Sequence, residues 1–153
     1  MVSPRCLLVK QGVASPQAPT PGYRCLVLFR PSGHVDHRLA RRHVLNEVKR
    51  GRLDRSDVCD AHPELLRAAR GVGQVSDVVC PICEDATVRY LTYAFGPRMP
   101  AQGKLVETEK ELARLDRGSA ELQGYTVEAC PACGWNHLQR SFAIGRRPAR
   151  SVT

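Results

Sequence analysis

The sequence predicts an α+β fold, in which a helical segment at residues 34–75 packs on an antiparallel sheet formed by residues 76–145. Two observations lead to this prediction. Between Asp36 and Arg70 the apolar residues recur at helical spacing, whereas after Val78 β-branched and aromatic residues form runs typical of strands. Apolar residues make up 42% of the chain but aromatic residues only 5%. A core with so few large rings would gain stability from a bound metal ion.

Two short cysteine motifs organise the second half of the chain. Cys80-Pro-Ile-Cys83 and Cys130-Pro-Ala-Cys133 each place two thiols three positions apart in a tight turn, in which proline presets φ. Two such turns supply the four soft ligands that tetrahedral Zn²⁺ prefers, at Zn–S distances of about 2.3 Å. We therefore predict one structural zinc ion, bound by these four cysteines.

Cysteine usage and the lack of long apolar runs bear on the compartment. The chain has seven cysteines, an odd number with four in paired motifs, which favours metal binding in a reducing cytosol over a disulfide framework. No apolar run approaches the roughly 18 residues of a membrane-spanning helix. Residues 1–10 lack the pattern of a secretory signal. We expect a cytoplasmic protein.

Positive charge lies at the two ends and in the front half of the chain. The net charge is +8, with 23 Lys and Arg against 15 Asp and Glu. Residues 76–139 contain nine acidic and six basic side chains, whereas residues 1–35 and 140–153 contain four basic and no acidic ones each. Because basic surfaces attract phosphates, nucleic acid is the partner that this charge favours.

The first 33 residues, which hold five of the eleven prolines, are predicted to form a flexible basic arm. A helix is predicted from about residue 36 to residue 49, with Asp36 as its N-cap and Gly51 as its stop. Its basic face either is solvated or binds phosphates. The side chains expected to contact phosphates are Arg38, Arg42 and Lys49 on this helix and Arg146, Arg147 and Arg150 in a basic tail at residues 146–153.

A second helical stretch covers residues 56–70 and is interrupted near Pro63, where Asp60 or His62 would cap the remaining helix. Cys59 and His62 also have the spacing of metal ligands. Because four better ligands lie elsewhere, Cys59 is either a small buried apolar residue or part of a second metal site.

The second half is predicted to contain strands on both sides of the cysteine motifs, an arrangement that makes a zinc ribbon. The 46 residues between the motifs exceed the usual spacing, and a helical insertion at residues 101–122 accounts for the excess. Within it, Thr108 and Glu111 match a capping box that opens a short helix. The strands are expected at residues 87–95, 124–129 and 137–144, and the last one places Leu138, Arg140, Phe142 and Ile144 on one face.

Trp135 and His137 follow the second cysteine motif directly. The Trp135 ring either covers the zinc thiolates from water or stacks on a base or on a partner side chain. His137 either donates a hydrogen bond to a ligand sulfur, packs in the core or replaces one cysteine as a ligand.

Three stretches carry a resemblance to a known family: Val58-Cys-Asp-Ala-His-Pro-Glu-Leu-Leu-Arg-Ala-Ala69, Cys80-Pro-Ile-Cys83 and Cys130-Pro-Ala-Cys133-Gly-Trp-Asn-His-Leu138. From about residue 35 to residue 145 the chain resembles a family of small uncharacterised actinobacterial proteins with a zinc-ribbon-like cysteine pattern. The resemblance implies an actinobacterial, cytoplasmic, zinc-dependent fold. It implies no activity, since none is assigned to that family.

We expect no enzymatic activity. A site of four cysteines is closed, whereas catalytic zinc keeps an open position, and the sequence has no HExxH, P-loop, GxSxG or dinucleotide-binding motif. The expected function is that of a zinc-binding accessory factor associated with nucleic acid or with a nucleoprotein machine of transcription or translation. The alternatives are a protein–protein interaction adaptor that uses the zinc ribbon, and a redox- or zinc-responsive switch.

Overall fold

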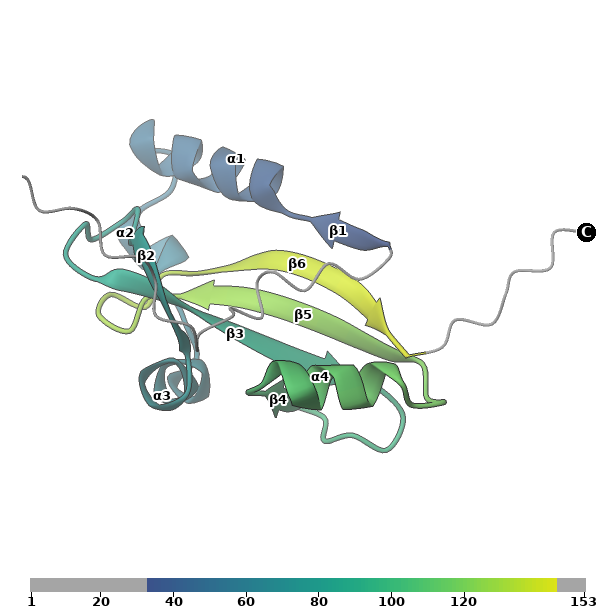
Figure 1. Cartoon of the computed structure of the whole chain (residues 1–153). Helices are drawn as coiled ribbons and strands as arrows, with labels where there is room; N and C mark the ends of the chain where they lie inside the picture. The colour runs from purple at the N-terminus through teal and green to yellow at the C-terminus, as the bar shows by residue number, and fades with distance from the viewer. Residues whose placement is uncertain (1–32, 146–153) are drawn as a thin grey trace, which may run out of the picture.

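An antiparallel sheet forms the centre of the structure, a computed structural model that describes residues 33–145 (Figure 1). Its strands lie in the order β1 (His34–Asp36), β6 (Asn136–Ile144), β5 (Leu122–Ala129), β3 (Thr87–Phe95) and β2 (Gln74–Val79), and β4 (Lys104–Val106) also pairs with β3. The helices of the described residues are α1 (Arg38–Lys49), α2 (Arg55–Val58), α3 (Pro63–Gly71) and α4 (Glu109–Asp116). The predicted α+β class is confirmed.

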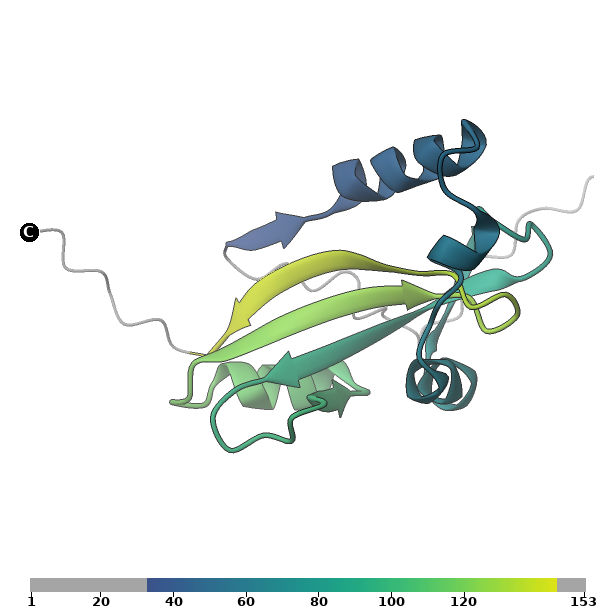
Figure 2. The ribbon, with the colours of Figure 1, turned by 180° about the vertical axis from the view of Figure 1, so that it is seen from behind.

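Helices cover the sheet on both faces. The core cluster that contains Leu112 of α4 also contains Ala94 and Phe142, whereas Ala69 of α3 packs with Leu91 on the opposite face. Helix α1 packs through the apolar side of its amphipathic surface onto the cluster around the cysteine motifs. Figure 1 shows α4 on the side of the sheet nearer the viewer, and Figure 2, seen from behind, shows α3 on the nearer side.

The N-cap of α1 is His37 and not the predicted Asp36, because the residues up to Asp36 form a strand. Asp36 is the last residue of β1 and lies opposite Arg140 of β6. Its carboxylate still accepts a hydrogen bond of 2.8 Å from the Arg38 N–H. Gly51, just after the helix, has φ of +69°, a conformation that favours glycine at a helix C-terminus. The segment at residues 34–75 therefore contributes β1 and the start of β2 as well as helices.

The second predicted helical stretch forms two separate helices, α2 and α3. His62 is the N-cap of α3: its Nδ1 accepts a hydrogen bond of 3.2 Å from the Glu64 N–H, and Pro63 follows as the first helical residue. Of the two predicted caps, His62 is thus confirmed and Asp60 is not. Because its Nδ1 already accepts this hydrogen bond, His62 acts as a helix cap.

The predicted insertion carries β4 as well as helix α4. The Glu111 N–H donates a hydrogen bond of 3.2 Å to Thr108 Oγ1, which confirms the predicted cap of α4. Strand β4 was not predicted, because its three residues pair with β3 and give too short a pattern to identify from sequence.

A bulge in β6 reverses the predicted alternation of its side chains. Arg140 lies opposite Thr126 and Leu138 opposite Val127, so Gln139 is an extra residue in β6. Leu138 consequently lies on the sheet face opposite that of Phe142. The prediction that Leu138 shares a face with the other three residues is wrong.

The basic arm, apart from Gly33, and the basic tail at residues 146–153 lie outside the described residues. Among the helices that the structure does describe, none has the length and apolar character needed to cross a bilayer.

Candidate metal centre

Four cysteines that are distant in the sequence meet at one end of the sheet. Cys80 follows β2, Cys83 precedes β3, Cys130 follows β5 and Cys133 precedes β6. Because β3 and β5 are antiparallel neighbours, both turns lie at the same end of the sheet (Figure 1). All four Sγ atoms lie within 4.8 Å of one another. The Cys80–Cys133 and Cys83–Cys130 sulfur distances are 3.6 Å and 3.7 Å.

The two cysteine turns share one backbone pattern. The Cys80 carbonyl accepts a hydrogen bond of 3.0 Å from the Glu84 N–H, and the Cys130 carbonyl accepts one of 3.1 Å from the Gly134 N–H. Glu84 and Gly134 both adopt positive φ, at 56° and 84°. Each turn therefore closes in the same way and directs its two sulfurs to the same point.

Burial and backbone contacts divide the four thiols into two kinds. Cys80 and Cys130 are buried, whereas Cys83 and Cys133 are half-buried. Burial raises the pKa of the Cys80 and Cys130 thiols. A hydrogen bond from the Asp85 backbone is the main cause that lowers the pKa of Cys83 to about 7. Metal binding needs deprotonated thiols, so a cation would displace protons from the buried pair. These four cysteines could hold one metal ion.

Trp135 lies in the cluster that surrounds the buried sulfurs and is 1% exposed. Its Nε1 donates a hydrogen bond of 2.8 Å to the Glu128 carboxylate, which also accepts one of 2.6 Å from Arg41 Nε. Its backbone N–H lies 3.4 Å from Cys133 Sγ. A ring buried in this way has no free face for a base or a partner side chain, and its covering of zinc thiolates stays a prediction. The burial of Glu128 was not predicted, because its partners come from other elements.

The His137 ring lies against Trp135, with the ring centroids 6.0 Å apart and the planes at 13°. Burial lowers the pKa of His137, so its imidazole is neutral at pH 7. Within residues 33–145, the group of side chains that could hold a metal ion comprises the four cysteines and does not include His137.

A fifth cysteine lies beside the four. Cys59 Sγ is 3.7 Å from Cys133 Sγ, although Cys59 does not belong to the group whose sulfurs all converge. The segment after α2 is held against the second cysteine turn, since the Ala61 N–H donates a hydrogen bond of 3.1 Å to the Gly134 carbonyl. A side chain at Gly134 would approach the Cys59 carbonyl oxygen to 3.0 Å. The group of side chains that could hold a metal ion within the described residues includes neither Cys59 nor His62, which does not support the alternative of a second metal site.

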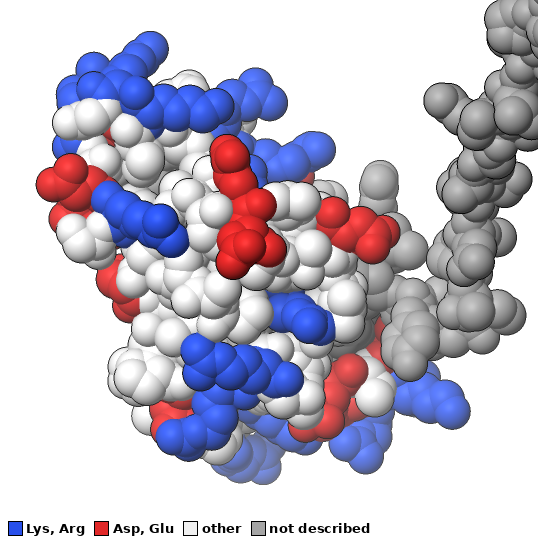
Figure 3. Space-filling view, turned by 90° about the vertical axis from the view of Figure 1, so that its left-hand side faces the viewer, with Lys and Arg blue, Asp and Glu red and all other residues white. Residues whose placement is uncertain are grey.

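The residues predicted to contact phosphates are only partly described. Arg38, Arg42 and Lys49 are exposed on α1, whereas Arg146, Arg147 and Arg150 lie outside the described residues. Figure 3 shows Lys and Arg side chains gathered at the top of this end of the molecule, over α1. A pocket of about 430 Å³ opens beside α1, and the basic residues that line it are Arg38, Arg41 and Arg42.

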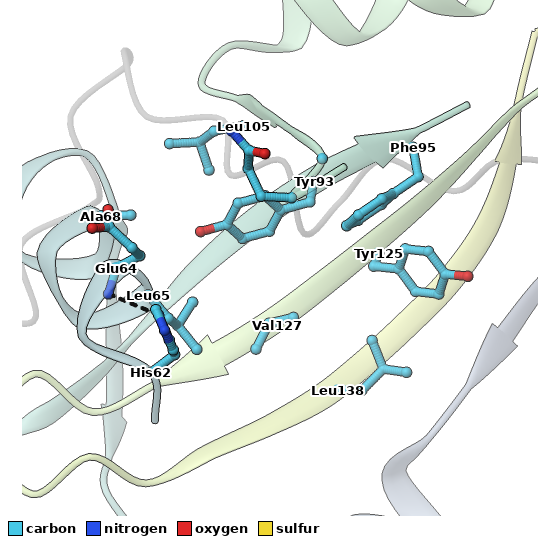
Figure 4. Close-up of a pocket in the computed structure, with 12 residues that line it drawn as sticks. His62, Glu64, Leu65, Ala68, Tyr93, Phe95, Leu105, Tyr125, Val127 and Leu138 are labelled. Atoms are coloured by element: carbon cyan, nitrogen blue, oxygen red, sulfur yellow. Dashed lines mark hydrogen bonds between the residues drawn. The ribbon is translucent and has the colours of Figure 1, made fainter. Parts of the chain in front are cut away.

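A larger pocket of about 780 Å³ lies on the opposite face, next to α3 (Figure 4). The rings of Tyr93, Phe95 and Tyr125 line it, and Phe95 and Tyr125 meet edge to face with centroids 5.5 Å apart. Leu138 also lines this pocket. The pocket was not predicted, because its lining comes from separate elements and the bulge in β6 brings Leu138 to this face.

Comparisons with known proteins place the chain in a family. A family model described as "Family of unknown function (DUF5318)" matches residues 30–153. Uncharacterized protein Rv0049 of Mycobacterium tuberculosis (strain ATCC 25618 / H37Rv) and uncharacterized protein Mb0050 of Mycobacterium bovis (strain ATCC BAA-935 / AF2122/97) are each 42% identical to this chain over 117 residues, which is 76% of this chain and 85% of theirs. No solved structure matches. The predicted resemblance to an uncharacterised actinobacterial family is confirmed: the chain belongs to the DUF5318 family.

Proposed function

We propose that this protein is a non-enzymatic zinc-binding factor, in which the four-cysteine site stabilises one end of the sheet and helix α1 binds the phosphates of nucleic acid in a nucleoprotein complex. The zinc ion would be structural. The proposal has two parts, the metal and the partner, which different observations support.

The sulfur geometry supports zinc as the metal. Tetrahedral Zn²⁺ with Zn–S distances of about 2.3 Å requires sulfurs roughly 3.8 Å apart, and two of the sulfur pairs lie at 3.6 Å and 3.7 Å. Four thiolates would fill the coordination shell and leave no position for water or substrate. A closed site of this kind contributes to folding and not to catalysis, which favours a non-enzymatic role.

The charges of α1 support a phosphate-bearing partner. Arg41 is paired with the buried Glu128, and Arg50 and Arg52 are paired with Glu47. Among the described residues, Arg42 and Lys49 have no ion pair. The observation that carries this part of the proposal is that two exposed cations on one helix are unpaired within residues 33–145. They can contact phosphates without breaking any of the described ion pairs.

Arg38 adds a third cation beside the pocket of about 430 Å³. It pairs with Asp36 at 2.8 Å, and its side chain is 78% exposed. An exposed pair of this kind stabilises a protein by only about 0–1 kcal/mol, so a phosphate can replace the carboxylate at little cost.

The proposal is tested with the full-length protein after its metal content has been measured, for which we expect one zinc per chain. Binding to a fluorescein-labelled DNA duplex is then measured over a range of salt concentrations. On duplex DNA the slope of log K against log salt is about −0.9 for each phosphate contact. We expect Arg42→Gln combined with Lys49→Gln to weaken binding and to reduce the slope by roughly 1.8, which corresponds to two contacts.

The matched control carries Lys110→Gln and Arg117→Gln, which remove the same charge from exposed positions at α4. This control should bind like the unchanged protein. Binding that does not depend on salt, or an equal loss in the control variant, would contradict the assignment of α1. A single-stranded RNA of the same length, measured in parallel, decides which nucleic acid is preferred.

A protein–protein interaction adaptor is the second candidate function, and strand β2 supports it. This strand is an end of the sheet order, and its side chains Val75, Val78 and Val79 are 70%, 43% and 54% exposed. An edge strand with exposed valines is a surface to which an extended peptide can add a strand. A partner that is captured after nuclease treatment and lost with Val75→Lys would favour the adaptor over the nucleic-acid factor.

A further inference from the structure

Cys59 and Cys133 form a pair of thiols at the border of the metal centre. Their sulfurs are 3.7 Å apart, and both residues are half-buried, so a small oxidant can reach them. A disulfide has an S–S bond of about 2.05 Å, so small side-chain movements would join the two sulfurs. Of the four cysteines that could bind the metal, Cys133 is the one whose sulfur lies next to Cys59.

The backbone and a cation hold this pair in place. The Cys59 N–H donates a hydrogen bond of 3.0 Å to the Arg55 carbonyl, and the Ala61 N–H donates one of 3.1 Å to Gly134, the residue after Cys133. A hydrogen bond with the Cys59 thiol is the main cause that raises the pKa of the exposed Arg55 guanidinium, and the Cys133 thiol contributes as well. An exposed, positively charged group therefore lies close to both sulfurs.

We propose that Cys59 is a resolving thiol, which removes Cys133 from the metal centre when the protein is oxidised by a peroxide. This inference rests on the proposed zinc site and assigns to it a way of releasing the metal. Three thiolates would remain after the reaction. Since a disulfide sulfur is a poor ligand, the zinc ion would then be held by an incomplete coordination shell.

The reaction balances with hydrogen peroxide as the oxidant. The Cys133 thiolate attacks one peroxide oxygen, so that an S–O bond forms, the O–O bond breaks and the departing hydroxide takes a proton from solvent to become water. The Cys59 thiol then attacks the oxidised Cys133 sulfur: an S–S bond forms, the S–O bond breaks and a second water leaves with the thiol proton. The two thiols lose two electrons, and the peroxide is reduced to two waters.

The test uses the full chain in a background that carries Cys6→Ser and Cys25→Ser, because these two cysteines lie outside the described residues and their thiols would complicate the assignment. The zinc content of the reduced protein is measured first. Hydrogen peroxide is then added, and zinc release is followed with a chromophoric chelator. The disulfides are mapped by mass spectrometry of protease fragments, before and after treatment with dithiothreitol.

We expect a disulfide between Cys59 and Cys133, zinc release that follows its formation, and recovery of zinc binding after reduction in the presence of zinc. Cys59→Ala should keep one zinc per chain in the reduced state and release it at least several-fold more slowly with peroxide. Cys59→Ser provides a second variant if the alanine protein does not fold. Both variants are compared with the background protein by thermal melting before the oxidant is added.

Two results would overturn the proposal: a disulfide between two of the four converging cysteines in place of the Cys59 pair, or equal release rates in Cys59→Ala and in the background protein. The failure of the zinc assignment is a separate result. A reduced protein without zinc would disprove the zinc site, and disulfide mapping on that protein would still show whether Cys59 and Cys133 react with each other.

Discussion

The two ends of the sheet are stabilised in different ways. At the α4 end, the buried apolar residues that pack together are Ala94, Val106, Leu112, Leu122, Phe142 and Ile144. At the cysteine end, the buried residues are Val58, Val88 and Trp135 together with the ligand candidates Cys80 and Cys130. Within the described residues, the core at the α4 end therefore contains no candidate metal ligand, whereas the core at the cysteine end is built around the candidate ligands.

The energies involved make this difference testable. A structural zinc ion contributes roughly 10–16 kcal/mol at neutral pH, and whole domains are stable by only about 5–15 kcal/mol. The cysteine end should then respond to metal removal and the α4 end to changes in apolar packing.

Loss of a zinc ligand should have the largest effect. We expect Cys130→Ser, or removal of the metal with a chelator, to unfold the cysteine end and to leave an aggregating or protease-sensitive protein. Hydrogen exchange should rise first in the turns that contain Cys80 and Cys130 and only later in α4. Cys59→Ser is the matched control, because this sulfur lies outside the group of four. A soluble Cys130→Ser protein with an unchanged melting temperature would show that the cysteine end does not depend on a bound metal.

Removing apolar volume from the other end should destabilise the protein without releasing the metal. Leu112 is fully buried, and substitutions of this kind cost about 2–5 kcal/mol. We expect Leu112→Ala to lower the free energy of unfolding by an amount in that range while one zinc per chain is retained. Leu39, which is 76% exposed, supplies the control: Leu39→Ala should change stability little. Zinc loss in the folded Leu112→Ala protein would mean that the two ends are one cooperative unit.

A smaller effect is expected from the buried carboxylate at the cysteine end. Glu128 accepts hydrogen bonds from Trp135 and Arg41, and leaving such a donor without its charged partner costs about 1–3 kcal/mol. Glu128→Gln should lower stability by this amount, with increased hydrogen exchange at the start of β6. Glu64→Gln, which breaks an exposed pair with Arg67, should cost about 0–1 kcal/mol. Equal effects of the two substitutions would argue against a structural role for the buried carboxylate.

The smallest expected effect is a pH dependence confined to the α4 end. A hydrogen bond from Lys104 is the main cause that lowers the pKa of Glu111 below its ordinary value of 4.5. A lowered folded-state pKa means that the stabilisation is fully present above pH 4.5 and is lost as the pH falls through the folded value. The protection of α4 against hydrogen exchange, corrected for the pH dependence of the intrinsic exchange rate, should therefore fall on acidification in the unchanged protein and less so in Glu111→Gln. Identical pH profiles in the two proteins would show that the Glu111 carboxylate does not stabilise the α4 end.

Much of the local structure could be predicted from the sequence, because it depends on residues close together in the chain. Only a few consecutive residues are needed to form each of these local structures: the two cysteine turns, the cap of α4 at Thr108 and the cap of α3 at His62. The pairing of the four ligands also followed from sequence, since two identical spacings have few other uses.

Features that depend on distant residues were not predictable. The bulge at Gln139 comes from the pairing of β6 with β5, and it decides that Leu138 lines the larger pocket. Strand β1 forms only because β6 offers it an edge. Residue spacing could not reveal either pairing, since strand register is set by contacts across the sheet.

The residue spacing alone predicts which four sulfurs converge, because each cysteine turn is a local structure that carries its two ligands with it. The surroundings of the four sulfurs depend instead on the packing of the whole fold. It buries Trp135 against Glu128, and it places Cys59, more than fifty residues before the second turn, beside Cys133. Burial and side-chain contacts of this kind are set by the packing of separate elements, and no spacing along the chain records that packing.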